Sequence, residues 1–185
     1  MQVSMQAADL SSNFFALFDL PVSFDLDLNA LADRYRQAQR AVHPDNFVNA
    51  SEAERRFSVQ MAARVNEGYR TLKDPLARAR HMLEVMGIEL NDMDTAFDGD
   101  FLMQQMDLRE RLAKVKASVE PHQQLQTIVQ DINAFAKSLS EEMAKFLQAV
   151  DNESLQQARI ITRKLQFFRR LNEEVGALDD ELSEF

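Results

Sequence analysis

The sequence has 185 residues, of which 45% are hydrophobic and 28% are charged, a composition typical of a folded protein rather than a disordered one. It contains 4 glycines and 4 prolines, whereas average usage would give roughly 13 and 9. The many tight turns of an all-β fold are therefore disfavoured, and helices are expected. The 30 acidic residues exceed the 21 basic residues, and the net charge of −9 opposes binding to nucleic-acid phosphates. We expect no nucleic-acid partner.

The absence of cysteine narrows the chemistry that the chain can perform. It excludes disulfides, thiol catalysis and thiolate ligation of zinc or of an iron–sulfur cluster by the chain itself. The first basic residue is Arg34, so the N-terminal segment lacks the charged leader of a secretory signal, and no apolar run approaches the length of a membrane span. We therefore expect a cytoplasmic protein with no membrane contact, no metal site and no cofactor.

The first predicted elements are a brief helix at 14–17 and a longer helix at 28–42. Asp27 is a good N-cap for the longer helix. The apolar positions of this helix, spaced three and four apart, are Leu28, Leu31, Tyr35, Ala38 and Val42. The helix ends at the polar loop 43–46, because Pro44 disfavours helical geometry at His43 and has no backbone N–H of its own.

A second long helix is predicted to run antiparallel to the first. Ser51 and Glu54 have the spacing of a capping box, so this helix is expected to open at Ser51. Its apolar stripe consists of Phe57, Met61, Val65, Tyr69 and Leu72. The brief helix at 14–17 is available to pack across the two long ones. Asp74 and Pro75 then predict the N-cap and first turn of another helix, which Gly87 ends.

The second half of the chain predicts a separate bundle. Residues 88–98 are polar, acidic and without helical periodicity, so we interpret them as a linker between a domain at 12–87 and a domain at 99–185. Beyond the linker lie three long helical patterns, near 99–118, 121–150 and 152–182. Their lengths and short connections favour an antiparallel three-helix bundle. The expected fold class is therefore all-α, with two domains.

Charge is distributed unevenly along the chain. Residues 1–30 carry four acidic residues and no basic one, whereas residues 31–80 carry ten basic residues and six acidic ones. The remaining residues, 81–185, carry eleven basic and twenty acidic residues. A basic segment within an acidic protein predicts electrostatic steering toward an acidic partner.

The loop between the two long N-terminal helices is part of the sequence AVHPDNF at 41–47. A histidine close to an aspartate suggests an acid–base pair, but no nucleophile, metal-ligand cluster or glycine-rich phosphate loop accompanies it. The plainest alternative is a turn that ends a helix, with Asp45 accepting hydrogen bonds from backbone amides. The other histidines, His81 and His122, have no ligand partner at helical spacing and are expected at the surface or in packing.

In its helical context this loop resembles that of the J-domain, whose His-Pro-Asp tripeptide stimulates ATP hydrolysis by a seventy-kilodalton heat-shock chaperone. The segment VNEGYRTLKDPLAR at 65–78 resembles the ending of a J-domain. The resemblance implies that His43, Pro44 and Asp45 press on the chaperone, and that arginines of the preceding helix contact its acidic surface. These arginines are Arg34, Arg36 and Arg40. A solvated helix face is their alternative interpretation.

Three further segments extend the resemblance over nearly the whole chain. NFFALFDLP near the N-terminus, DGDFLMQQMDLRERL at 98–112 and RKLQFFRRL at 163–171 are similar to the HscB family of co-chaperones. Members of this family pair an N-terminal J-domain with a C-terminal three-helix bundle, and bring the iron–sulfur scaffold IscU to the chaperone HscA. The resemblance implies a J-domain at 12–87, a scaffold-binding bundle at 99–185, and HscA and IscU as partners.

The helix predicted near 99–118 has apolar residues on two faces. At about 100° per residue, one narrow arc gathers the expected core positions. These are Phe101, Leu108, Leu112, Val115 and Val119. Leu102, Met103 and Met106 project broadly to the opposite side. Three large apolar side chains on the polar side of an amphipathic helix need a partner, which either another part of the chain or a second protein supplies.

The resemblance implies that a set of bundle residues binds IscU. The set is Leu102, Met103, Met106, Asp107, Glu110 and Phe167. Phe167 lies off the centre of the core stripe predicted for the last helix, and core-edge packing is its alternative interpretation. That stripe is Ile161, Leu165, Phe168, Val175 and Leu182. Two residues depart from the family's pattern: Asn46 stands where a basic residue is usual after the tripeptide, and Lys114 where an acidic one is usual.

Three functional interpretations remain open at the level of the sequence. The first is a non-enzymatic adaptor with no catalytic residues, which joins IscU to HscA and stimulates HscA. The second is a J-protein of general protein folding, although the glycine-rich linker and cysteine repeats of the larger folding co-chaperones are absent. The third is an enzyme in which His43 and Asp45 exchange protons. The extent of the family resemblance favours the adaptor.

Overall fold

The computed structural model describes residues 12–48, 50–91 and 97–184, and the regular structure in these ranges is entirely helical. The predicted all-α fold class is therefore confirmed. The chain divides into two compact units, one ending at Gly87 and the other beginning at Ile88. The predicted linker at 88–98 falls partly on residues outside the described ranges, so its boundaries stay a prediction. Within the described ranges, no helix is both long enough and apolar enough to cross a membrane.

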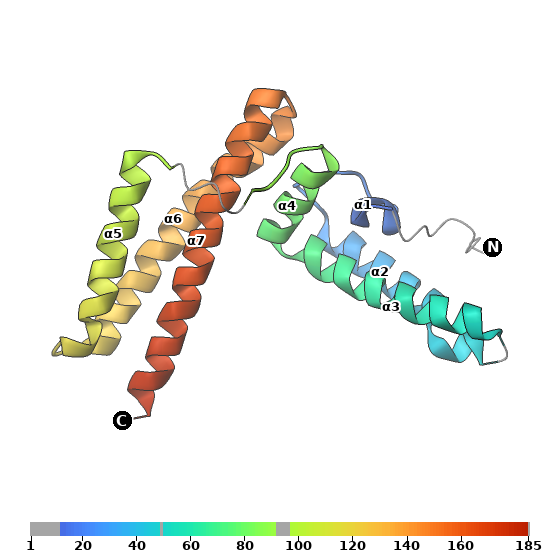
Figure 1. Cartoon of the computed structure of the whole chain (residues 1–185), viewed down its shortest axis with the longest axis horizontal. Coiled ribbons are helices and arrows are strands. Elements are labelled where there is room, and N and C mark those ends of the chain that lie inside the picture. Colours follow the sequence, from blue (N-terminus) through green and yellow to red (C-terminus); the bar gives the residue numbers. More distant parts are fainter. Residues whose placement is uncertain (1–11, 49, 92–96, 185) are drawn as a thin grey trace. The chain divides into compact units, whose positions relative to one another are not determined.

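The first unit is built on an antiparallel pair of helices, which Figure 1 shows in blue and green. Its elements are α1 (Phe14–Leu17), α2 (Leu28–Val42), the 3-10 turn η2 (Pro44–Phe47), α3 (Glu52–Lys73) and α4 (Pro75–Val85). The predicted caps are present: Asp27 accepts hydrogen bonds from the first turn of α2, and Ser51 forms a capping box with Glu54. One residue of the apolar stripe on α2 does not lie in the core. Leu28 is 47% exposed, because it begins α2, whereas Leu26 is buried.

The short helix α1 packs closely on α3 at Gly68. A Cβ atom added there would lie 2.9 Å from the Phe14 ring and 3.1 Å from the Phe18 ring. From α4, Nε2 of His81 accepts a hydrogen bond from the backbone N–H of Phe14 at 2.9 Å, and the His81 ring stacks on Phe15. Burial lowers the pKa of His81 and so favours the neutral ring that this hydrogen bond requires. His81 is thus a packing residue of the first unit.

The second unit consists of α5 (Gly99–Lys114), the 3-10 turn η3 (Val115–Ala117), α6 (Pro121–Ala149) and α7 (Asn152–Ser183). Arg111 of α5 contacts Asp131 of α6, and His122 near the start of α6 contacts Asp179 near the end of α7. Together with the helix directions in Figure 1, these contacts show an up-down-up bundle. The predicted antiparallel three-helix bundle is therefore confirmed.

The bundle core contains most of the predicted stripe on α5, with one error at its end. The buried cluster is Phe101, Leu108, Val115, Leu125, Ile128, Ile132, Phe168, Leu171 and Val175. Val119, predicted to belong to this core, is 99% exposed. The reason is that α5 ends at Lys114 and the chain continues as η3, so the helical periodicity that placed Val119 on the core face does not persist.

Replacing Gly68 by alanine is expected to destabilise the first unit by about 1–3 kcal/mol, because the new methyl group would push against two phenylalanine rings. The chain's two tyrosines, Tyr35 and Tyr69, both lie in this unit, so tyrosine fluorescence during urea unfolding reports on it alone. Gly176→Ala, in the second unit and with nothing within 4 Å of its Cβ position, should leave this midpoint unchanged and checks that the signal reports on the first unit alone. An unchanged unfolding midpoint for Gly68→Ala would contradict the close approach of α1.

Candidate functional site

The His-Pro-Asp loop lies between α2 and α3 and exposes its polar side chains. His43 is the N-cap of η2: its Nδ1 atom accepts a hydrogen bond from the backbone N–H of Asp45 at 3.3 Å. The Asp45 carboxylate lies 3.5 Å from the same nitrogen. The two side chains are 59% and 85% exposed. The turn is therefore closed by the histidine, with its ring and the carboxylate side by side at the surface.

A buried residue at the end of the loop anchors it to the first unit. Phe47, the last residue of η2, is 9% exposed, and η2 contacts α3. Two backbone hydrogen bonds of 3.0 Å tighten the turn, from Asn46 N–H to the His43 carbonyl and from Ala50 N–H to the Phe47 carbonyl. The loop thus presents an exposed histidine and aspartate on a turn whose final residue is part of the packed interior.

A polar and aromatic clamp joins α2 to α3. The Tyr35 and Tyr69 rings stack with centroids 4.1 Å apart. The Tyr35 hydroxyl donates to Oδ1 of Asn66 at 2.9 Å, and the Gln39 amide donates to the Tyr35 hydroxyl at 2.5 Å. The sequence placed both tyrosines on apolar stripes but did not predict this clamp. Because α2 and α3 flank the loop, the clamp holds in place the two helices that the loop connects.

Beside the loop, α2 and α3 border an open hollow of about 750 Å³. Its lining combines the loop residues 43–46 with Arg36, Gln39 and Arg40 of α2 and with Ala62 and Asn66 of α3. Two of the three predicted chaperone-contacting arginines therefore lie next to the tripeptide.

The three arginines of α2 differ in their charge partners. Arg34 pairs with Asp19 at 3.1 Å, and Arg36 pairs with Asp33 one turn earlier on α2. In the part of the chain that the structure describes, Arg40 has no carboxylate within ion-pair distance. Of the three, Arg40 is therefore the cation most available to an acidic partner, and it is also the nearest to His43 in sequence.

The second candidate surface lies on α5. Leu102 is 43% exposed, and Met103 and Met106 are each 71% exposed. The N-terminus of α5 is fixed by Asp98, whose carboxylate accepts hydrogen bonds from the Phe101 N–H at 2.8 Å and from Lys164 of α7 at 2.5 Å. These hydrogen bonds lower the pKa of Asp98. The apolar patch of Leu102, Met103 and Met106 thus stands on a helix end that is tied to the bundle.

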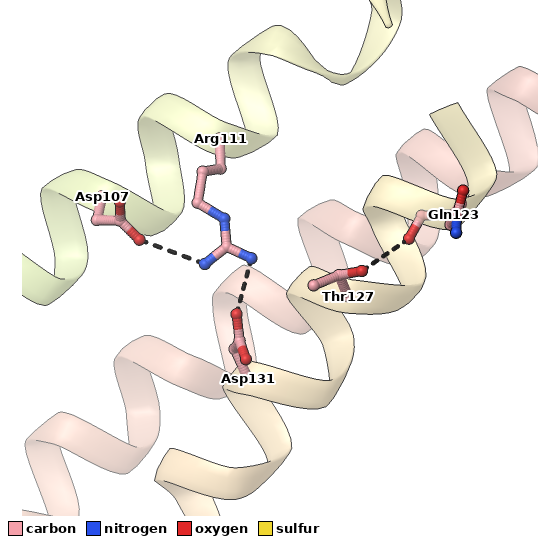
Figure 2. Close-up of polar contacts among 5 residues, drawn as sticks. All are labelled: Asp107, Arg111, Gln123, Thr127 and Asp131. Carbon is pink, nitrogen blue, oxygen red and sulfur yellow. Dashed lines mark hydrogen bonds and ion pairs between the residues drawn. The ribbon is translucent and has the colours of Figure 1, made fainter. Parts of the chain in front are cut away.

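Asp107 and Glu110 form an acidic edge beside this patch. Arg111 connects Asp107 to the bundle, as Figure 2 shows. Its guanidinium donates to Asp107 on the same helix at 3.3 Å and to Asp131 on α6 at 2.7 Å. The hydrogen bond to Asp131 is the main reason that the pKa of Arg111 is raised. A basic residue four positions after Asp107 was visible in the sequence, but its partner on α6 depends on the packing of the two helices.

Lys114 also contacts the acidic edge. Its ammonium group donates to Glu110 at 2.5 Å, and this contact lowers the pKa of Glu110. Lys114 therefore places a cation beside a predicted binding carboxylate. Among the described residues, no group of three or more His, Asp or Glu side chains is placed to hold a metal ion.

Phe167 lies at the edge of the bundle core. Its ring makes edge contacts with Phe101 and Phe168, at centroid distances of 5.7 Å and 5.5 Å, and the guanidinium of Arg109 lies 5.6 Å from its centroid. Phe167 is only partly buried. It thus joins α5 through the core residue Phe101, which directly precedes Leu102, and core-edge packing describes its observed contacts.

Comparisons with known proteins match both units. Residues 97–176 match the family model described as "HSCB C-terminal oligomerisation domain". A co-chaperone protein HscB homolog from Shewanella woodyi is 42% identical over 93% of this chain and 99% of its own length. A homolog of the same name from Pseudoalteromonas atlantica is 42% identical over 94% of this chain and 99% of its own. The chain belongs to the HscB family of co-chaperones.

Solved HscB structures agree with this assignment. The chaperone HscB from Vibrio cholerae has a TM-score of 0.80 and 38% sequence identity, with 92% of this chain and 99% of the other covered. The human co-chaperone HscB has a TM-score of 0.83 and 30% identity, with 92% and 84% covered. The first unit is accordingly the J-domain and the second the C-terminal bundle of the HscB family. The names of these relatives describe them as co-chaperones or, for the protein from Vibrio cholerae, as a chaperone.

Proposed function

We propose that this chain is an adaptor of iron–sulfur protein maturation that brings the scaffold IscU to the chaperone HscA and stimulates ATP hydrolysis by HscA. The observation that carries the proposal is the exposed His43–Asp45 pair on a turn anchored by the buried Phe47. The HscB family membership supports the choice of partners. The adaptor acts in the cytoplasm and performs no catalysis of its own.

The loop acts on HscA as a rigid contact. Because Pro44 restricts the turn and Phe47 anchors it, little conformational entropy is lost when the loop docks. His43, Pro44 and Asp45 contact the conformation of HscA that hydrolyses ATP, and their preferential binding shifts HscA toward that conformation. Arg40, with Arg34 and Arg36 earlier on α2, steers the J-domain toward an acidic surface of HscA.

The patch on α5 binds IscU. Leu102, Met103 and Met106 supply exposed apolar area, and methionine side chains adapt their shape to a partner at low cost. Asp107 and Glu110 form an acidic edge beside them, which Arg111 and Lys114 partly neutralise. We include Phe167 as a contact at the margin of this surface, because it is only partly buried. The hydrophobic side chains provide the affinity, and the charges favour a particular orientation of IscU.

The two surfaces on one chain convert two separate encounters into one. When IscU is held by the bundle, its concentration near an HscA molecule bound to the J-domain is set by the connection between the units. The adaptor therefore raises the effective concentration of IscU at HscA without any direct increase in the affinity of either partner for the other.

Replacing His43 by glutamine is expected to abolish stimulation of HscA ATP hydrolysis. Helicity and melting temperature should stay unchanged, because the His43 side chain is exposed and its replacement removes no packing contact. The measurement is steady-state ATP turnover by HscA with increasing amounts of each chain. His122→Gln is the matched control: its side chain is 58% exposed and also faces a carboxylate, but it lies in the bundle. Normal stimulation by folded His43→Gln would defeat the assignment of the loop.

The double variant Leu102→Ala/Met106→Ala is expected to weaken IscU binding at least about tenfold, because truncating one buried interface anchor costs about 1–4 kcal/mol. Titration calorimetry with IscU measures the change. Val59→Ala/Val119→Ala is the control, since it truncates two other exposed apolar side chains. Unchanged affinity of the Leu102/Met106 variant would remove the patch from the proposal.

A further inference from the structure

We propose that Asn46 is a positioning residue that replaces the hydrogen bond which Pro44 cannot make, and so holds His43 and Asp45 in their exposed geometry. The side-chain amide of Asn46 donates from Nδ2 to the backbone carbonyl of Arg40 at 2.7 Å. The functional part of this inference rests on the proposed action of the loop on HscA. The structural part, that the Asn46 amide orders the loop, does not rest on the proposed function, because it concerns the chain without HscA.

The Arg40 carbonyl needs an unusual donor because of where the proline stands. In a continuing α-helix, this carbonyl would accept from the backbone N–H four residues later. That residue is Pro44, which has no N–H. The Asn46 amide reaches back six positions in the sequence and takes the place of the missing donor. The last turn of α2 is thereby capped by a side chain from the loop itself.

Asn46 also holds the other end of the turn. Its backbone N–H donates to the His43 carbonyl at 3.0 Å. One residue therefore bonds both to the last turn of α2 and to the first residue of the tripeptide. Together with the hydrogen bond from Asp45 N–H to the His43 ring, these contacts tie the loop to α2 on either side of Pro44. They restrict rotation of the loop about His43, whose extended backbone marks the end of the helix.

The expected consequence of losing the amide is a looser loop, with the fold retained. The Asn46 side chain and the loop around it are exposed, so water can satisfy the Arg40 carbonyl when the amide is removed. A single exposed hydrogen bond of this kind changes the ratio of ordered to open loop by about two- to tenfold. A partner that binds only the ordered loop then shows an affinity reduced in proportion to the fraction of ordered loop, and so by no more than the same factor.

The structural test uses nuclear magnetic resonance relaxation on the ¹⁵N-labelled full chain without HscA. Asn46→Ala and the near-isosteric Asn46→Asp, which has no amide donor, should both lower the backbone order parameters of His43 and Asp45. In a Pro44→Ala background, position 44 regains an N–H that can bond to the Arg40 carbonyl, so Asn46→Ala should have a smaller effect. Asn29→Ala, at the opposite end of α2, is the control. Order parameters unchanged in both Asn46 variants would overturn the inference.

The functional test measures HscA ATP turnover as a function of the concentration of the chain. Asn46→Ala should raise the concentration needed for half-maximal stimulation, by at most about tenfold, and leave the maximal rate unchanged. If the loop loosens but this concentration does not change, Asn46 has no positioning role toward HscA and the functional part of the inference fails. If the wild-type chain itself gives no stimulation, the proposed function fails, while the order parameters still decide the structural part.

Discussion

A loop that acts as a contact has to be exposed and ordered at the same time, and these two demands oppose each other. Exposed turns lack the packing that orders a chain, and a proline at a helix end removes one of the hydrogen bonds that would compensate. Here the opposition is resolved by short-range contacts. Phe47 is buried at the end of η2, while His43 closes the turn and Asn46 caps the last turn of α2. The exposed groups of the loop can then remain in water without becoming mobile.

The second unit meets a similar demand with a long helix instead of a turn. The inner face of α5 carries Phe101 and Leu108 into the bundle core, while Leu102, Met103 and Met106 remain exposed on the same helix. Contacts of its polar residues with α6 and α7 fix the helix in place. An apolar patch can therefore be held ready for a partner because the opposite face of its helix provides the packing that stabilises it.

Charge pairing modifies both surfaces. On α2, Arg34 and Arg36 have acidic partners within the J-domain, whereas Arg40 has none among the described residues. On α5, the carboxylates of Asp107 and Glu110 are each bonded to a basic residue one turn later. The formal charges in the sequence therefore overstate how many charged groups each surface has free for a partner protein. A group that is already paired within the chain must give up that partner to bind another.

The sequence was sufficient to predict what depends on neighbouring residues. Asp27 and the Ser51–Glu54 capping box marked helix starts, because a cap depends on residues within one turn. The prediction failed where periodicity was extended past the end of a helix, as at Val119, and apolar spacing also did not imply burial at the first residue of a helix, as at Leu28. At those positions the geometry of the helix end decides whether the side chain is exposed.

Contacts between distant segments lay outside what one sequence reveals. The bond from Arg111 to Asp131 requires the register of α5 against α6, and the clamp of Tyr35 with Asn66 requires that of α2 against α3. The bond from Asn46 to the Arg40 carbonyl is closer in sequence. Even so, the absence of an N–H on Pro44 indicated only that the helix would end, and not which group would satisfy the carbonyl left behind.

The most direct measurement of the adaptor mechanism is HscA ATP turnover with IscU and a mixture of two defective chains, one carrying His43→Gln and the other Leu102→Ala/Met106→Ala. Each chain keeps the surface that the other lacks. If the two surfaces must belong to one molecule, the mixture will fail to reach the rate given by IscU with the wild-type chain. A mixture as effective as the wild-type chain would show that the loop and the patch act independently, and would contradict the adaptor mechanism.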